Sequence, residues 1–209
     1  MYKNYLVMFL FILLSGCEKP QPKPDPELAD MHLPESTSPQ TSNPMRDEEN
    51  FPNASTTTEW IQTTANNDIK PIITALGAYL KRDHFQLKAS NTGTDAFSLN
   101  DCRQNKILRI QGTGIQSYWA KRSKGIGQNK DYFPDFHLEV LSLSSTQQAE
   151  ATFKRLQQAL ASSNGFCNGK SPIKLVQKDQ HIFYFGTRAE MFRGYINTYA
   201  EWIEQYSAR

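Results

Sequence analysis

The chain has 209 residues, of which 38% are hydrophobic and 21% are charged. Its N-terminal apolar run covers about ten residues, half of what a bilayer-spanning helix requires, which excludes a membrane span there. The formal net charge is +2, but residues 18–58 contain eight acidic and three basic residues, whereas residues 59–209 contain thirteen acidic and nineteen basic ones. A basic folded region favours acidic protein surfaces, anionic lipid head groups or lipopolysaccharide phosphates as partners.

The first seventeen residues have the organisation of a bacterial secretion signal. Lys3 precedes the apolar run, and Leu14, Ser15 and Gly16 precede Cys17. This stretch resembles the lipobox of bacterial lipoproteins, in which an apolar residue and two small residues precede an obligatory cysteine. The resemblance implies that residues 1–16 are removed as a signal peptide and that Cys17 is linked to diacylglycerol and acylated on its freed amine. A plain secretory signal with an incidental cysteine is the alternative.

The residue after Cys17 bears on which membrane holds the anchor. In lipoproteins of double-membraned bacteria an aspartate at this position commonly causes inner-membrane retention, and this chain has Glu18. We therefore expect an outer-membrane lipoprotein that faces the periplasm. Its expected partners are the lipid bilayer, through acylated Cys17, and another envelope protein. Nucleic acid would be an unusual ligand in that compartment and is not expected.

Residues 17–58 are expected to form the lipidated cysteine and a disordered tether. Eight of the eleven prolines lie between residues 20 and 52, among many Ser, Thr, Asn and Glu residues. Such a segment cannot bury enough apolar surface to offset the entropy lost on ordering. Residues 59–209, by contrast, are numerous enough to form a single domain with its own core.

Two cysteines, Cys102 and Cys167, remain once Cys17 is lipidated. An even number in an oxidising compartment predicts a disulfide bond. Closing a loop of about 65 residues would stabilise the fold by roughly 4 kcal/mol in the chain-entropy description. The alternative is a thiol nucleophile together with an unrelated buried cysteine.

The first half of the domain is expected to contain a helix and then two strands. Thr57 or Thr58 would cap a short helical turn that carries Trp60 and Ile61. From Asp68, a candidate cap, apolar residues at helical spacing predict a helix that ends around residues 82–85. A polar loop at 91–100 follows. Strands are predicted at 107–111 and 115–119, and a basic, glycine-containing loop at 121–131.

The second half is expected to contain a strand, a helix, a hairpin and a last helix. Residues 136–143 alternate in polarity, with Phe136, Leu138 and Val140 on one face. Ser145 and Gln148 resemble a capping box, which predicts a helix followed by Gly165. Residues 173–177 and 181–185 predict a hairpin. Thr187 and Glu190 predict a second capping box for a last helix, whose apolar stripe runs from Phe192 to Tyr206.

Together these elements predict an α+β domain in which about three helices cover a small, mainly antiparallel sheet of about four strands.

Few residues suggest catalysis. The sequence contains no HExxH, CxxC, GxSxG or Walker motif, so neither a metal site nor a cofactor is expected. His137 and Glu139 share one strand face and, with His181, are the first candidates for an envelope hydrolase; a solvent-facing strand surface is the alternative. Ser171 and Lys174 match the spacing of SxxK acylases by chance, since the companion motifs of those enzymes are missing.

The most suggestive candidate for binding is a segment in which aromatic residues lie beside cations. Planar side chains bury area at low entropic cost, and cations steer acidic partners, so this composition is typical of a binding edge. In the alternative interpretation Trp119, Tyr132 and Phe133 belong to the core and the cations are simply solvated. The candidate binding residues are Tyr118, Trp119, Lys121, Arg122, Lys124 and Lys130.

These observations favour a lipid-anchored, non-catalytic protein-binding module, such as an accessory subunit of an envelope assembly or secretion machine. An immunity protein against a periplasmic toxin is one alternative, and an envelope hydrolase is another.

Overall fold

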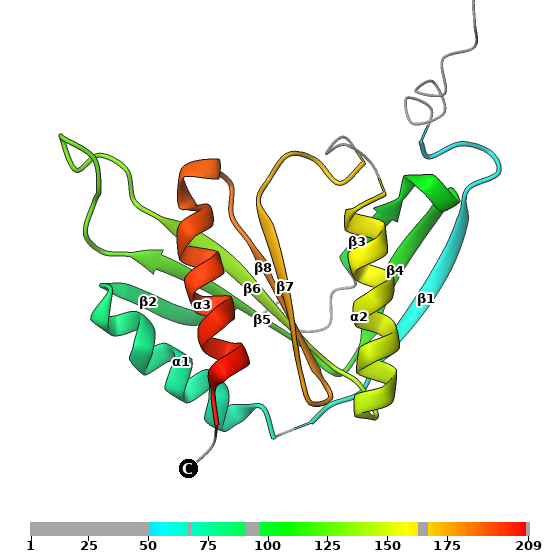
Figure 1. The fold of residues 1–209 in the computed structure, drawn as a ribbon, viewed down its shortest axis with the longest axis horizontal. Coiled ribbons are helices and arrows are strands. Elements are labelled where there is room, and N and C mark those ends of the chain that lie inside the picture. Colours follow the sequence, from blue (N-terminus) through cyan, green and yellow to red (C-terminus); the bar gives the residue numbers. More distant parts are fainter. Residues whose placement is uncertain (1–50, 67, 91–96, 163–166, 208–209) are drawn as a thin grey trace, which may run out of the picture. The chain divides into compact units, whose positions relative to one another are not determined.

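The computed structural model describes residues 51–66, 68–90, 97–162 and 167–207, so Cys17, the predicted signal peptide and most of the predicted tether lie outside the described residues. The described part contains two β-sheets and three α-helices (Figure 1). One sheet has the order β1-β4-β3, with β1 (Thr57–Thr63), β3 (Phe97–Asp101) and β4 (Lys106–Gly112). The other has the order β2-β5-β6-β8-β7, with β2 (Phe85–Ser90), β5 (Ile115–Arg122), β6 (Asp135–Ser142), β7 (Ile173–Lys178) and β8 (His181–Gly186).

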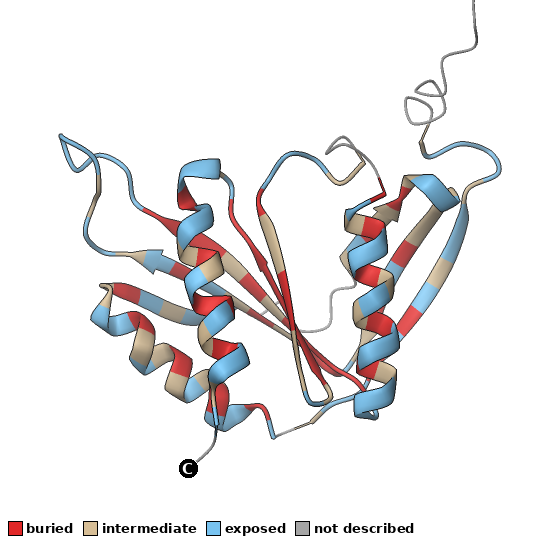
Figure 2. Cartoon of the chain, viewed as in Figure 1, coloured by how far each residue is buried: buried red, intermediate tan, exposed pale blue. Residues whose placement is uncertain are grey.

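Helices α1 (Lys70–Arg82) and α3 (Arg193–Gln205) cover one face of the five-stranded sheet. Alternate residues of β6, Phe136, Leu138 and Val140, point to that face and are at most 1% exposed, as the period of two along a strand requires. The edge of Phe85 in β2 packs against Tyr199 of α3, with ring centroids 5.6 Å apart. The apolar stripes of both helices therefore meet one continuous core (Figure 2).

A second core lies on the other face of the same sheet, where α2 (Thr146–Leu160) and the three-stranded sheet pack. Leu156 of α2, Leu108 and Ile110 of β4, and Ile182 of β8 are fully buried there. Because β8 lies between two cores, every one of its residues is buried, the pattern of a strand covered on both faces.

The chain passes from one sheet to the other through a turn with two glycines. Gly112 has φ of 116°, a conformation that costs a side-chain-bearing residue strain. A Cβ at Gly114 would lie 2.6 Å from the carbonyl oxygen of Ser142 and 2.5 Å from that of Thr64. The close approach lets the Thr64 amide donate to Ser142 O at 2.9 Å, which joins the end of β1 to β6.

The predicted disulfide between Cys102 and Cys167 is present, with Cα atoms 6.0 Å apart. Cys102 begins a 3-10 turn, η3 (Cys102–Gln104), directly after β3. The bond therefore ties the three-stranded sheet to the segment between α2 and β7.

The α+β class is confirmed, but the prediction of about four strands in one sheet is too low. Three strands were missed, β1, β2 and β3. The sheets are mainly antiparallel, and the parallel pair is β1 with β4. The three helices do not cover one sheet face, because α2 belongs to the second core.

The prediction of a helical turn at Trp60 and Ile61 is wrong, because both residues lie in β1. Ile61 is 8% exposed and Trp60 is 56% exposed, so the two side chains alternate across a strand. The long-range pairing of β1 with β4 outweighs the local signal of a threonine cap.

Of the caps predicted for the three longer helices, two also need correction. Ser145 caps α2 as expected, its hydroxyl accepting from the Gln148 amide at 3.2 Å. Asp68 does not cap α1, whose cap residue is Ile69 with no side-chain bond. Thr187 donates its hydroxyl hydrogen to Asp135 O at 2.7 Å, and a 3-10 turn, η4 (Glu190–Phe192), separates it from α3. The predicted end of the middle helix at Gly165 lies outside the described residues.

Candidate functional site

The predicted aromatic and basic segment forms the second half of β5 and the loop after it. Since side chains alternate along a strand, Tyr118 and Trp119 point to opposite faces of the sheet. Tyr118 faces the helix side, where its hydroxyl donates to Gln116 Oε1 at 2.7 Å and burial raises its pKa. Trp119 lies on the other face and is 44% exposed. The structure therefore divides the predicted binding residues between two surfaces.

Three of the predicted residues, Trp119, Lys121 and Arg122, line one hollow of about 340 Å³. We call it the aromatic-basic hollow. Phe133, 39% exposed, adds a second aromatic side chain, so Trp119 and Phe133 do not belong to the core. The other lining residues are Gln86, Lys88 and Ser123.

The hollow is positively charged. Lys88 is paired across the strands with Trp119, and Gln86 with Lys121, so the two lysines are diagonal neighbours on one face. Such neighbours lie about 7–8 Å apart, within the range where like charges repel. Among the described residues that line the hollow there is no carboxylate.

The strand carboxylate across from Lys121, Asp135, has Arg188 as a counter-ion. It lies across from Lys121 in the β5–β6 pair, but its side chain is buried and its Oδ1 lies 3.0 Å from Arg188 Nε. The lysine charges of the hollow are therefore available to an acidic ligand.

Backbone hydrogen bonds fix the base of the loop that borders the hollow. The amide of Arg122 donates to Pro134 O at 2.8 Å, and that of Ser123 donates to His84 O at 2.8 Å. Arg122 also donates from Nε to Asp83 O at 3.0 Å, so its guanidinium is held in place. Lys124 and Lys130 are exposed residues of this loop and do not line the hollow.

The hydrolase candidates do not converge. His137 and Glu139 share a face of β6, whereas His181 is paired with Ser142 at the other end of that strand. Five residues separate His137 from Ser142, a distance of about 17 Å at the usual rise of a strand. Ser142 also points to the opposite face, so His181 cannot act with the other two on one substrate bond.

Glu139 and His137 lie in a row of partly buried side chains. Ser117 donates a hydrogen bond to Glu139 Oε2; burial raises the pKa of Glu139, and this bond opposes the rise. His137 stacks on Tyr184 with ring centroids 5.7 Å apart, and burial lowers its pKa. Burial and the nearby Glu139 charge raise the pKa of Tyr184 to about 12. Each polar group thus has a packing partner within the sheet.

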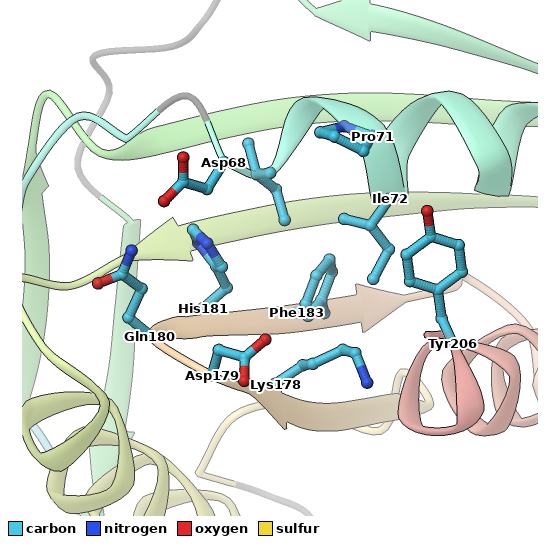
Figure 3. Close-up of a pocket in the computed structure, with 10 residues that line it drawn as sticks. Asp68, Pro71, Ile72, Lys178, Asp179, Gln180, His181, Phe183 and Tyr206 are labelled. Atoms are coloured by element: carbon cyan, nitrogen blue, oxygen red, sulfur yellow. The ribbon is translucent and has the colours of Figure 1, made fainter. Parts of the chain in front are cut away.

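His181 instead lines a separate pocket of about 320 Å³ between the start of α1, the β7–β8 turn and the end of α3 (Figure 3). Its Nδ1 lies 2.9 Å from Ser142 Oγ, and burial lowers its pKa against the opposing effect of Asp179 and Asp68. Figure 3 shows both carboxylates at the same end of the pocket as His181, with Tyr206 at the other end. This pocket has an apolar floor and an acidic end, so its charge is opposite to that of the aromatic-basic hollow.

Neither pocket has the composition of a metal centre. In the part of the chain that the structure describes, no group of three His, Cys, Asp or Glu residues is placed to hold a metal ion. The geometry favours the aromatic-basic hollow as the functional site, because it combines exposed aromatic side chains with two lysines and no carboxylate among its described lining residues.

Sequence reasoning missed the residues that β2 contributes, Gln86 and Lys88. The predicted helix ends around residues 82–85 and the predicted loop begins at residue 91, so the segment between them has no predicted structure, whereas Phe85–Ser90 forms β2 beside β5. The alternation of Phe85 and Leu87 with Gln86 and Lys88 is the signal that could have identified a strand.

Within the described residues, no helix is both long and apolar enough to cross a bilayer. No protein-family model, no curated protein and no solved structure matches the chain.

Proposed function

We propose that the chain is an outer-membrane lipoprotein whose folded domain binds another envelope protein without catalysing a reaction. The observation that carries this proposal is the aromatic-basic hollow, in which exposed Trp119 and Phe133 lie beside Lys88 and Lys121. Aromatic side chains at the centre of a contact supply most of the binding free energy in typical protein interfaces. Lysines around them accelerate association with an acidic partner.

The N-terminal signal and the disulfide support the location. The lipobox-like stretch ending at Cys17 would anchor the chain in a membrane, and several acyl chains hold a protein far better than one. The bond between Cys102 and Cys167 belongs to an oxidising compartment such as the periplasm. Labelled palmitate should enter the wild-type protein and not a Cys17→Ser variant; labelling of that variant would contradict the anchor.

Binding is tested by affinity isolation from detergent-solubilised envelopes, with the full-length protein as bait. We expect one stoichiometric partner whose capture falls at least tenfold when Lys88 and Lys121 are both changed to Glu. The matched control changes Arg103 and Lys154, two exposed cations outside the hollow, to Glu, and should capture as much as the wild type. Capture that both double variants retain equally, or no partner for a folded bait, would contradict the proposal.

The identity of the partner then separates two kinds of binding module. A resident component of the envelope would indicate an accessory subunit of an assembly or secretion machine. A toxin would indicate an immunity protein.

A further inference from the structure

Strand β2 presents a free edge beside the aromatic-basic hollow. It is the outermost strand of the five-stranded sheet, paired with β5 on one side. The Ser123 amide donates to His84 O, so residues of the same parity as His84, namely Gln86 and Lys88, direct their backbone groups toward β5. Leu87 and Ala89 therefore direct their N–H and C=O groups outward. None of the described residues bonds to these groups.

The other outer strand of the sheet, β7, is also paired on one side, with β8. Helix α3 packs beside β7 (Figure 1), and Lys178 at the end of β7 donates to Glu204 O of α3 at 3.2 Å. Proteins commonly cover outer strands in this way to prevent unwanted pairing. Helix α1 likewise packs against β2, so the aromatic-basic hollow on the opposite face distinguishes β2 from β7 as a binding edge.

A groove borders β2 on its helix-facing side, opposite the aromatic-basic hollow. It has a volume of about 360 Å³ and lies between α1 and β2. Gly77 and Ala78 of α1 form one wall of the groove, and Leu87 and Ala89 of β2 form the other. The lining of the groove is therefore mainly apolar. Its remaining lining residues are Ile73, Thr74, Lys81 and Tyr118.

We propose that the partner binds by adding an extended acidic segment to β2 as a sixth strand of the sheet; this inference rests on the binding function proposed above. Main-chain hydrogen bonds to Leu87 and Ala89 would hold the segment. Its side chains would alternately enter the aromatic-basic hollow on one face of the sheet and the groove on the other. Acidic side chains would lie beside Lys88 and Lys121, and apolar side chains would enter the groove beside Gly77. The described residues that line the hollow and the groove include no carboxylate and four cations, Lys81, Lys88, Lys121 and Arg122.

Charge also argues against a second copy of this chain as the added strand. Pairing of β2 with β2 would bring two sets of the same lysines to one edge, where like charges destabilise the contact.

Two substitutions separate strand addition from binding in the hollow alone. Ala89→Pro removes an N–H group that points away from β5, so every hydrogen bond between β2 and β5 is kept. Proline is tolerated at such positions of an edge strand. Gly77→Leu places a side chain in the groove, where a Cβ at residue 77 meets nothing within 4 Å; leucine is also the better helix former. Gly194→Leu on α3 is the matched control, because a Cβ there also meets nothing within 4 Å.

The probe is a phage-displayed library of random twelve-residue peptides, selected on the full-length protein in detergent micelles. We expect enriched peptides in which acidic and apolar residues alternate. Ala89→Pro and Gly77→Leu should each weaken their binding at least tenfold, and Gly194→Leu less than twofold. Bound peptide should slow amide hydrogen exchange in residues 85–90. Urea unfolding of each variant checks that the fold is retained.

Several outcomes would overturn strand addition. These are the absence of enriched peptides, binding unchanged in both Ala89→Pro and Gly77→Leu, or self-association of the chain through β2. If reversal of Lys88 and Lys121 abolishes binding while Ala89→Pro and Gly77→Leu do not, the hollow binds its partner and strand addition is wrong. If neither an envelope partner nor a peptide binds, the proposed function fails as well.

Discussion

Arg155 of α2 connects two strands of the three-stranded sheet, and its replacement should weaken that connection. Its Nη1 lies 2.9 Å from Asp101 Oδ2 at the end of β3, and its Nη2 lies 3.0 Å from Glu59 Oε2 on β1. The side chain of Asp101 is 2% exposed and that of Glu59 is 35% exposed. Asp101 is therefore a buried carboxylate, and among the described residues Arg155 is its counter-ion.

We expect Arg155→Met to lower the free energy of unfolding by about 2–3 kcal/mol. Removing one partner of a fully buried ion pair costs about 3–5 kcal/mol, because the remaining charge is left uncompensated. The expected value is smaller here for two reasons. Arg155 is 20% exposed, and Asp101 keeps the hydrogen bond from the Gln104 amide at 3.1 Å.

Urea unfolding followed by tryptophan fluorescence, with the disulfide intact, measures this change. A slope of about 1–3 kcal/mol per molar urea converts it into a midpoint shift of roughly 1 M. In the Arg155→Met background, Asp101→Asn should restore part of the stability, since it removes the uncompensated charge. In the wild type the same substitution should destabilise. A loss below about 0.5 kcal/mol for Arg155→Met, or an Asp101→Asn effect of the same sign in both backgrounds, would refute this reasoning.

The same ion pair predicts a dependence on pH. The hydrogen bond from Arg155 lowers the pKa of Glu59 below its ordinary value of 4.5. A lowered folded-state pKa contributes stability that is present above the unfolded pKa and lost as the pH falls through the folded one. The difference in unfolding free energy between the wild type and Arg155→Met should therefore become smaller below about pH 4.5.

Three further predictions concern the disulfide and the buried polar row. Replacing Cys102 and Cys167 with Ser should lower the unfolding free energy by up to about 4 kcal/mol, and urea unfolding that leaves the midpoint unchanged would contradict this. Ser117→Ala removes a hydrogen bond to the charged form of Glu139, whose pKa burial raises. The free energy of unfolding should fall by about 1 kcal/mol at pH 7 and by less at pH 4, where Glu139 is protonated. An equal fall at both pH values would argue against this role of Ser117. Because the pKa of Tyr184 is raised to about 12, the stability that this residue contributes is fully present below its ordinary pKa of 10 and is lost as the pH rises toward 12. Urea midpoints measured at several pH values should show a smaller alkaline loss for Tyr184→Phe, and identical profiles would refute the assignment.

Elements whose buried residues recur at a regular spacing along the chain could be predicted from the sequence. The alternation of Phe136, Leu138 and Val140 identified β6, and Ser145 with Gln148 located the start of α2. The hairpin of β7 and β8 and the helical stripe of α3 were found in the same way. In each case the pattern of burial repeats within one element, so no distant partner is needed to recognise it.

Two of the three missed strands, β1 and β2, depend on contacts that lie far away in the sequence, whereas β3 pairs with the neighbouring β4 and lies partly in the predicted polar loop. β1 pairs with β4, about fifty residues later, and threonine at its start was taken for a helix cap. α1 ends at Arg82, and the chain then turns through His84 at a φ of 65°, a conformation uncommon for a residue other than glycine. Because no glycine marks this turn, the sequence does not indicate that a strand begins directly after it.

The candidate site shows the same division. Composition identified Trp119, Lys121 and Arg122, which the structure brings together in one hollow. The contribution of Lys88 could not be inferred, because it depends on the register between β2 and β5. The exposure of Phe133 depends on how the loop after β5 folds back, which spacing does not encode.

Photo-crosslinking in cells that make the protein tests the central claim most directly. The full-length chain would carry p-benzoylphenylalanine at Trp119 or, as a matched control, at Trp60, since both tryptophans are exposed, at 44% and 56%. The proposed function predicts one crosslinked envelope protein from position 119 and none from position 60, with the product lost when Lys88 and Lys121 are changed to Glu. Equal products from both positions, or no product at position 119, would contradict a partner bound in the aromatic-basic hollow.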